Sequence, residues 1–526
     1  MPPIRTPTPS SSTSASPAPL VARADLRRRE VAQTLLPSTK TALGQFMTPA
    51  PIAQFMASLF VPPASSEVRI LDPGAGVGSL TAALVQSLCD LPNAAKEVTV
   101  TCYEIDRTLI PHLQGTLQEC LRTAQSAGLI FHSQLRELDF IQDAAETLSP
   151  DLFSPSATAQ SYTHAILNPP YKKIQTGSLH RKLLSRTGIE TSNLYSAFVA
   201  LAIKLLAPSG QLVAITPRSF CNGPYFLPFR KLLLAEMSIL RIHTFESREE
   251  AFRDDNVLQE NVILFAAKSP QSDNVMLSSS RGPQFHSITS RIAPFTEVIR
   301  DGDPYLIIHI PTTEDDKRVA LQLRSLRFTL DDLSIQVSTG PVVDFRLRPH
   351  IHHHATSSSV PLLYPAHFKS GLVQWPQPDG RKPNAIDLND QTRKWLMPQG
   401  NYAVTRRFSS KEERRRVVGA VFDPARTPGK MIGFENHLNV FHTGGHGLPA
   451  AIARGLCIFL NSTLVDRFFR QFNGHTQVNA SDLRNLRYPS LDILHSLGSA
   501  WREGPLPSQE TIDALVDTAL AREHSR

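Results

Sequence analysis

A proline-rich tetrapeptide contains the residue types that point most directly to chemistry. It ends the run His164-Ala-Ile-Leu-Asn-Pro-Pro-Tyr171, in which an apolar strand is expected to lead straight into Asn168. Pro169 and Pro170 fix φ and remove two backbone donors, so carbonyl acceptors are held rigidly. The Asn168 side-chain oxygen and the Pro169 carbonyl can accept both N–H bonds of an exocyclic amine, which makes its lone pair available. We expect Tyr171 to stack on the base that carries this amine.

Such an amine could displace a methyl group in line, without a metal ion or a covalent enzyme intermediate. Much of the rate would then come from positioning. A base in duplex DNA must leave the stack to reach a pocket of this kind. The weaker interpretation is a proline-stiffened loop whose tyrosine lies in the core. A preceding strand and a glycine-rich turn upstream favour the catalytic interpretation.

That glycine-rich turn is expected where an apolar strand at residues 68–71 meets a helix that begins near residue 80. Gly74, Gly76 and Gly78 let the backbone turn sharply and approach a ligand closely. Dinucleotide enzymes use similar turns. Here, however, Asp72 precedes the turn, and a carboxylate can face the ammonium group of a methionine moiety but would repel a pyrophosphate. These features favour S-adenosylmethionine as the cofactor.

Further acidic positions are consistent with this cofactor. The next strand ends in Cys-Tyr-Glu-Ile-Asp, and a carboxylate at the carboxyl end of a second strand can accept hydrogen bonds from both ribose hydroxyls. Glu104 is the first candidate for this role and Asp106 the second. Asp139 and Phe140 follow another apolar stretch. There Asp139 could accept a hydrogen bond from an adenine amino group while Phe140 stacks on the ring.

Apolar strand-like segments alternate with helical segments over much of the chain, which predicts an α/β fold with a doubly wound, mostly parallel, Rossmann-like sheet. Strands are expected at residues 68–71, 98–103, 164–167, 211–216, 239–244 and 261–267, with helices near 80, 109, 194–206 and 226–236. We place a catalytic domain at residues 41–268, after a disordered N-terminal extension at residues 1–40. Residues 269–300 are expected to be a linker, and residues 301–526 a mixed α+β domain.

Composition limits the classes of protein to consider. Hydrophobic residues make up 41% and charged residues 19% of the 526 positions, which suits a globular protein with two or three units. The net charge of +7 permits a polyanionic partner without demanding one. The five cysteines show no CxxC spacing, which argues against a disulfide frame or a zinc site. We find no signal peptide and no uncharged stretch of the ~18 residues that a membrane span needs.

These motifs, in this order, resemble those of the gamma-class N6-adenine DNA methyltransferases, the TaqI-like modification methylases of type II restriction–modification systems. The resemblance rests on DPGAGVGS, YEID, LDF and NPPY and covers roughly residues 41–268. It implies methyl transfer from S-adenosylmethionine to the N6 amino group of a flipped adenine. It also implies that Thr48 and Pro49 contact the methionine end of the cofactor and that Phe252 helps to hold the adenine. One departure is Gly74-Ala75, where many relatives have Ala-Cys.

The C-terminal domain is expected to recognise the target, because a methylase for duplex DNA needs groove contacts and phosphate neutralisation. A basic cluster around Phe408 could bind phosphates, although a solvated helix face paired with Glu412 and Glu413 is nearly as good an interpretation. Residues 471–487 are rich in Asn, Gln and Arg, which can make bidentate base contacts. The residues assigned to DNA are Arg406, Arg407, Arg414, Arg415, Asn473, His475, Gln477, Asn479 and Arg484.

The expected partner is double-stranded DNA, with any cognate restriction endonuclease encoded on a separate chain. The protein is expected to act as a monomer in the cytoplasm. Other substrates stay open, since NPPY also occurs in methyltransferases acting on release-factor glutamine and ribosomal RNA guanine, and N4 of cytosine is a further target. A non-catalytic DNA-binding subunit is the alternative from a different class.

Overall fold

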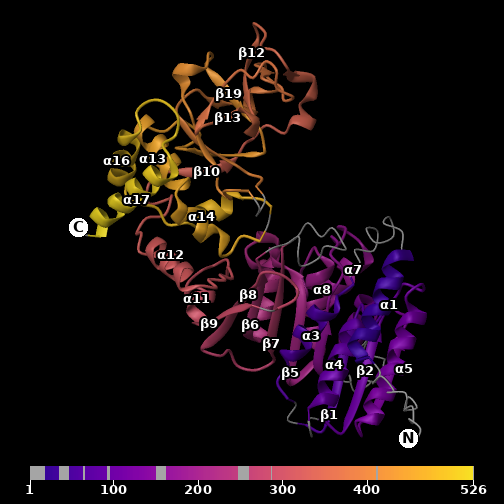
Figure 1. The fold of residues 1–526 in the computed structure, drawn as a ribbon. Coiled ribbons are helices and arrows are strands. Elements are labelled where there is room, and N and C mark those ends of the chain that lie inside the picture. The colour runs from indigo at the N-terminus through magenta and orange to yellow at the C-terminus, as the bar shows by residue number, and fades with distance from the viewer. Residues whose placement is uncertain are drawn as a thin grey trace, which may run out of the picture.

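A nine-stranded sheet lies at the centre of the N-terminal part of the chain (Figure 1). The computed structural model describes residues 18–34, 47–62, 65–91, 95–149, 161–246, 260–285, 287–409, 413–474 and 476–524. The strand order of the sheet is β3-β2-β1-β4-β5-β7-β6-β8-β9. Its strands are β1 (Glu67–Pro73), β2 (Glu97–Tyr103), β3 (Ile130–Arg136), β4 (Tyr162–Leu167), β5 (Leu206–Pro217), β6 (Ser238–Phe245), β7 (Asn261–Ala267), β8 (Asn274–Ser280) and β9 (Ile288–Pro294).

Strands β1 to β5 run parallel, so their carboxyl ends meet at one edge of the sheet. Pro73 pairs with Tyr103, which in turn pairs with Arg136, and Leu167 pairs with Ala214. Strand β7 is antiparallel to both neighbours, β5 and β6. The loops after β1, β2, β4 and β5 therefore start from the same edge, where open α/β sheets bind ligands. The mostly parallel, doubly wound sheet expected from the sequence is confirmed.

Helices cover both faces of this sheet, because successive residues of a strand point to opposite faces and the central strands carry apolar side chains on both. In β1, Val68 and Ile70 pack into one core cluster, while Leu71 packs into the cluster on the opposite face. The first face carries α1 (Leu20–Thr34), α3 (Ala50–Ser58), α4 (Ser79–Asp90) and α5 (Ile110–Ser126). The second carries α6 (Phe140–Leu148), α7 (Leu179–Arg186), α8 (Leu194–Leu205) and α9 (Leu227–Glu236).

The N-terminal extension differs from the sequence-based expectation. Residues 20–34 were expected to be disordered but form α1, whose Leu20, Val21 and Ala24 are buried against the sheet-covering helices. Residues 1–17 and 35–40 of that extension lie outside the described residues. Helix α1 thus belongs to the folded catalytic part.

The expected linker at residues 269–300 also differs. It contributes β8 and β9, which extend the central sheet at one edge. The serines of this segment obscure the pattern of apolar residues that would predict a strand. In β8 they are buried, and the Ser278 and Ser280 hydroxyls lie 2.9 and 3.1 Å from the two ring nitrogens of His243. Hydrogen bonding satisfies these polar groups, so a serine-rich segment can enter the sheet.

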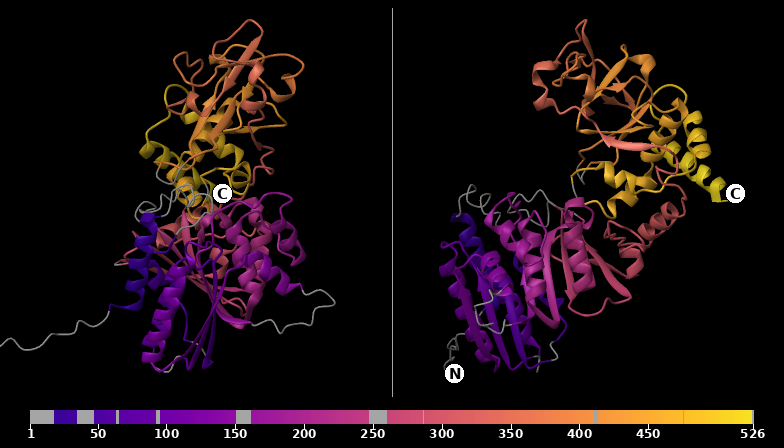
Figure 2. Two further views of the ribbon diagram at one scale, coloured as in Figure 1. Left: turned by 90° about the vertical axis from the view of Figure 1, so that its right-hand side faces the viewer. Right: turned by 180° about the vertical axis from the view of Figure 1, so that it is seen from behind.

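Two smaller sheets and a set of helices make up the C-terminal part, which confirms its expected mixed α+β character. Their strands are β10 (Gln336–Thr339), β11 (Ile351–His352), β12 (Ser359–Leu363), β13 (Phe368–Lys369), β14 (Leu372–Val373), β15 (Ala385–Asp387), β16 (Met397–Pro398), β17 (Tyr402–Arg406), β18 (Gly419–Phe422), β19 (Met431–Phe434) and β20 (Leu438–His442). The helices are α11 (Phe295–Val298), α12 (Glu314–Arg324), α13 (Ala450–Leu460), α14 (Thr463–Arg470), α15 (Ala480–Arg484), α16 (Leu491–Ala500) and α17 (Gln509–His524). Figures 1 and 2 show α11, α12 and α14 between the large sheet and the two small ones. Within the described ranges, every helix falls short of the length and hydrophobicity of a bilayer span.

Buried hydrogen bonds join the two parts. Arg218, directly after β5, donates to the carbonyls of Arg470 and Gln471 at 2.9 and 2.6 Å and pairs with Glu260 at 2.6 Å. The Asn222 side chain donates to Asp482 at 3.0 Å. Unpaired buried charges are costly, so these contacts fix the C-terminal part against the loop that follows β5.

Two glycines allow α13 and α16 to cross closely. A Cβ atom on Gly455 would overlap the carbonyl of Leu494, and one on Gly498 would overlap the carbonyl of Ala451. We expect Gly455→Ala to lower the free energy of unfolding by about 1–3 kcal/mol, because the overlapping atoms belong to the backbone and cannot move aside. Urea unfolding followed by fluorescence measures this change.

The matched control is Gly115→Ala in α5. Its new methyl group would lie 3.3 Å from the end of the Arg27 side chain, which can move. This substitution should be neutral or slightly stabilising, since alanine favours helix more than glycine does. Equal unfolding midpoints for the two variants would contradict the close crossing.

Candidate active site

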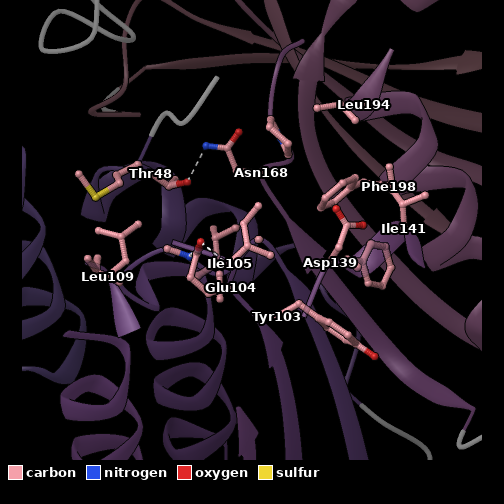
Figure 3. A pocket seen from close by; sticks show the side chains of 18 of the residues that line it. Thr48, Tyr103, Glu104, Ile105, Leu109, Asp139, Ile141, Asn168, Leu194 and Phe198 are labelled. Carbon is pink, nitrogen blue, oxygen red and sulfur yellow. Dashed lines mark hydrogen bonds between the residues drawn. The ribbon is translucent and has the colours of Figure 1, made fainter. Parts of the chain in front are cut away.

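The Asn168 side chain, just beyond the carboxyl end of β4, is held between two hydroxyl groups. Its Nδ2 donates to Thr48 Oγ1 at 3.0 Å (Figure 3). Its Oδ1 accepts a hydrogen bond from the Tyr171 hydroxyl at 3.0 Å. Thr48 is buried. Each end of the amide therefore has a hydroxyl partner, and these two hydrogen bonds fix its orientation.

Helix α1 anchors the segment that carries Thr48. Pro49 caps α3, and the Ala50 N–H, in the first turn, donates to Asp25 Oδ1 of α1 at 3.2 Å. Burial acts to raise the pKa of Asp25, but the Arg28 guanidinium, 2.7 Å away, outweighs it and holds the pKa below its ordinary value. An ionised, buried carboxylate thus fixes the start of α3 and, through it, the hydroxyl that orients Asn168.

The tetrapeptide and the glycine-rich turn open into one cavity of about 180 Å³ (Figure 3). These motifs are far apart in the sequence, and the parallel strands β1 and β4 bring them together at the carboxyl edge. The cavity is lined by Met47, Thr48, Gly74, Ala75, Gly76, Val77, Ser79, Leu80, Tyr103, Glu104, Ile105, Leu109, Leu138, Asp139, Phe140, Ile141, Asn168, Pro170, Lys172, His180, Leu194 and Phe198.

Glu104 is a buried carboxylate at the end of β2 that faces this cavity. Its Oε2 accepts from the Gly76 N–H at 2.8 Å, and its Oε1 accepts from the N–H groups of Ile105 and Asp106 at 2.9 and 2.8 Å. Burial raises the pKa of Glu104 above its ordinary value, although these backbone donors act to lower it. A carboxylate held by three backbone donors has a fixed orientation, and one of its about four acceptor sites, on Oε2, remains for a hydroxyl donor.

Glycines in the turn allow its backbone to adopt left-handed conformations beside the cavity. Gly74, Gly76 and Gly78 have φ angles of 77°, 59° and 84°, a region that favours glycine. A Cβ atom at Gly78 would approach the Leu113 side chain to 2.9 Å. Gly74 and Gly76 line the cavity, whereas Gly78 begins α4 beneath it.

Asp72 and Asp106 do not line the cavity, which corrects the expectation that they face the cofactor. Asp72 is fully buried below the turn, where its Oδ2 accepts from the Thr81 hydroxyl at 2.6 Å. Asp106 caps the next turn by accepting from the Thr108 N–H at 2.9 Å. Asp72 therefore holds the first turn of α4, and Asp106 holds the turn after β2. Residue type and spacing alone do not distinguish this structural role from ligand binding.

Asp139 and Phe140 lie on the opposite wall from Thr48. Asp139 Oδ1 accepts from the Gln142 N–H at 3.0 Å as the N-cap of α6, and its Oδ2 lies 2.9 Å from His180 Nε2. Phe140 packs against Phe198 with ring centroids 5.1 Å apart. This wall therefore combines an oriented carboxylate with aromatic rings.

Sequence reasoning missed several lining residues. His180 is a single histidine in a polar segment, and Phe198 lies within an apolar helix, so neither has a distinguishing signal in one sequence. Lys172, which also lines the cavity, directly follows the tetrapeptide and could have been suggested by that position. Pro49, Pro169 and Tyr171 border the site without being among the lining residues.

The residues predicted to contact DNA are divided between surface and interior. Asn473 is 3% exposed, its Nδ2 donates to Asp482 Oδ2 and to the Gln477 carbonyl, and its Oδ1 accepts from Arg416. Its assignment to base contacts is corrected, because an internal polar network uses its amide. Arg414 and Arg484 are exposed, and Arg406, Arg407, Arg415, Gln477 and Asn479 are half-buried. Phe252 and His475 lie outside the described residues.

Comparison with known proteins identifies the family. A model of the Eco57I restriction-modification methylase matches residues 117–252. The chain is 45% identical over 494 residues to the type II methyltransferase M.PstI of Providencia stuartii, covering 94% of this chain and 96% of that protein. The chain belongs to the type II restriction–modification methyltransferases.

A second relative of this methyltransferase is M.BsuBI of Bacillus subtilis, which is 46% identical over 459 residues, covering 87% of this chain and 90% of that protein. Among solved structures, a complex of DrdV with DNA aligns with a TM-score of 0.48 at 12% identity, covering 93% of this chain and 60% of that one.

The family uses S-adenosylmethionine, and the cavity suits this cofactor. It presents a buried carboxylate for hydroxyl groups, an aromatic wall and open space at Gly76, where a Cβ atom would meet nothing nearer than Met47 at 4.0 Å.

The bond between Asn168 and Thr48 predicts the effect of removing one hydroxyl. Thr48→Val keeps the shape of the side chain but removes the hydroxyl that accepts from the amide nitrogen, so the amide is oriented less firmly. We expect kcat for methyl transfer to DNA to fall roughly 10- to 100-fold, as misplacement of a positioning group does. The dissociation constant for S-adenosylmethionine should change much less. Thr48→Ser should restore kcat, and a wild-type kcat in Thr48→Val would exclude the orienting role.

Asp72 predicts a pH dependence of stability. Burial raises its pKa from 3.8 to about 7, so the folded protein retains a proton that the unfolded chain releases between these values. The contribution of Asp72 therefore lowers the free energy of unfolding as pH rises through this interval, by on the order of 1–4 kcal/mol. Above the folded-state pKa the loss is complete and constant.

Asp72→Asn removes this titration, so the unfolding free energy of the variant relative to wild type should increase between pH 5 and pH 8. Urea unfolding at both pH values measures the difference. Asp90→Asn, at an exposed carboxylate, is the control and should leave the pH dependence of the wild type unchanged. A parallel pH profile for Asp72→Asn and wild type would contradict the buried, protonated state.

Proposed function

We propose that this methyltransferase transfers the methyl group of S-adenosylmethionine to the N6 amino group of an adenine flipped out of duplex DNA. The supporting observation is the single cavity that contains Asn168 together with Glu104 and Asp139. Glu104 would hold the ribose hydroxyls of the cofactor, Asp139 its adenine amino group and Phe140 its ring. When bound, the cofactor supplies an electrophilic methyl group.

Two oxygen acceptors would activate the target amine. The lone pair of an exocyclic amine is delocalised into the ring, which makes the nitrogen a poor nucleophile. Asn168 Oδ1 and the Pro169 carbonyl would accept its two N–H bonds and favour a pyramidal nitrogen with an available lone pair. Rigid acceptors lower the barrier because they need no rearrangement during the reaction.

The Tyr171 hydroxyl need not leave Asn168 when the base enters. An amide oxygen has two lone pairs, so Oδ1 can accept from Tyr171 and from the amine at once. The Tyr171 ring is half-buried, and its hydroxyl also lies 3.5 Å from the Ile215 carbonyl of β5. Held in this way, the ring can stack on the flipped base.

The C-terminal part would supply DNA recognition, with residues 301–526 as the target-recognition domain. Exposed Arg414 and Arg484 are the clearest candidates for phosphate or base contact. A cognate endonuclease would be a separate chain, and a monomer would suffice, since the catalytic site and the recognition surface lie on one polypeptide.

Substitution of Asn168 tests the proposal. Purified protein is incubated with labelled S-adenosylmethionine and unmodified genomic DNA, and the nucleosides are separated. We expect label in N6-methyladenine, and we expect Asn168→Ala to reduce kcat by about 10²-fold or more, as loss of a preorganised polar contact does. Binding of DNA and cofactor should persist.

The control is Asn274→Ala, an exposed asparagine at the amino end of β8, which should transfer methyl groups at the wild-type rate. Label in N4-methylcytosine would replace the proposed target with cytosine. Label found in protein or RNA, with none in DNA, would overturn the proposal.

A further inference from the structure

Tyr225 is an exposed aromatic residue in the loop that follows β5. Its surface is 79% exposed, whereas its neighbour Phe226 is 5% exposed. A single exposed aromatic residue is common on protein surfaces. What distinguishes Tyr225 is the rigidity of the segment that carries it and the position of that segment beside the tetrapeptide.

A buried arginine holds this loop from within. Arg230 of α9 is fully buried, and its Nη1 donates to the carbonyls of Phe220 and Gly223 at 2.7 and 2.9 Å. Its Nε and Nη2 donate to the Tyr305 carbonyl at 2.9 and 2.8 Å. A buried guanidinium is tolerated when such acceptors surround it, and here it fixes the backbone two residues before Tyr225.

A second buried arginine ties the same loop to the C-terminal part. Arg218 pairs with Glu260 and donates to the carbonyls of Arg470 and Gln471. The backbone of Arg218 also lies against Gly474, where a Cβ atom would come within 2.7 Å of it. The loop that presents Tyr225 is therefore fixed at the junction between the catalytic part and the C-terminal part that is expected to bind DNA.

Aromatic contacts connect this loop with the tetrapeptide. The rings of Tyr171 and Tyr195 meet edge to face with centroids 6.4 Å apart, and the Tyr195 and Phe226 centroids are 5.5 Å apart. The Tyr195 hydroxyl lies 2.8 Å from the Ser219 hydroxyl of the loop. Tyr225 directly precedes Phe226, so its exposed ring extends from a segment that is joined to the tetrapeptide through Tyr195.

We propose that Tyr225 enters the DNA stack beside the target and fills the space that the flipped base leaves. This inference rests on the proposed function, since it applies to an enzyme that extrudes a base. Extrusion breaks stacking on both sides of the base. Aromatic and apolar side chains that insert between base steps compensate for this loss, and a base stacks on any aromatic ring without sequence preference.

A rigid loop lets the Tyr225 side chain insert into DNA at a lower cost in conformational entropy. A loop that had to become ordered on binding would lose part of the stacking free energy to conformational entropy. The bonds from Arg218 and Arg230 order the loop in advance. Pro224, which precedes Tyr225, further restricts the backbone.

The experiment compares two DNA duplexes that carry the sequence methylated by the wild-type enzyme, as mapped on plasmid DNA. In one duplex the target adenine is paired with thymine, and in the other it lies opposite an abasic site, where extrusion costs less. We expect Tyr225→Ala to lower kcat/KM on the paired duplex roughly 10- to 100-fold, the range for loss of one stacking contact. On the abasic duplex most of this loss should disappear.

Tyr225→Phe keeps the ring and should match the wild-type enzyme on both duplexes. Ile130→Ala removes another exposed apolar side chain, at the opposite edge of the sheet, and should also match it. Wild-type kcat/KM for Tyr225→Ala on the paired duplex, or an equal loss on both duplexes, would overturn the inference. If the wild-type enzyme leaves no N6-methyladenine in any DNA, the proposed function itself fails.

Discussion

The hydrogen bond from Asn168 Nδ2 to Thr48 Oγ1 is the constraint on which the candidate site depends. An amide side chain presents a donor end and an acceptor end of nearly equal size, and only the acceptor end suits an amine. With its nitrogen bonded to Thr48, the amide keeps its oxygen on the side of the Tyr171 hydroxyl, where the proposed function would place the amine. Asp25 of α1 supports this arrangement through the Ala50 N–H, so a helix far from the chemistry contributes to its geometry.

Parallel pairing of β1, β2 and β4 turns separate sequence motifs into one cavity, because all three strands end at the same edge. Some polar side chains near this edge line the cavity, and others hold the structure beneath it. Glu104 and Asp139 face the cavity, whereas Asp72 is buried beneath it. Buried ionic contacts at Arg218 then extend the same rigid edge to the C-terminal part. A base and a cofactor can therefore be positioned by a framework that is already ordered.

The sequence predicted the sheet, the glycine turn and the tetrapeptide, because strand periodicity, glycine and proline act locally. Burial of polar groups by distant partners has no local signal. For this reason α1, rich in arginine, and the serine-rich strand β8 were assigned to unstructured segments. The same cause explains Asn473, whose amide bonds to Arg416 and Asp482 inside the protein, and His180, which pairs with Asp139 at the cavity wall.

A crystal structure of the enzyme with its DNA target and a non-reactive analogue of S-adenosylmethionine tests the central claim most directly. The quantities to measure are the distances from the N6 atom of the target adenine to Asn168 Oδ1 and to the Pro169 carbonyl oxygen. Our account predicts that both lie at about 2.7–3.2 Å, within hydrogen-bonding range, with Asn168 Nδ2 still bonded to Thr48. A target base bound elsewhere, or an Asn168 amide turned with its nitrogen toward N6, would contradict it.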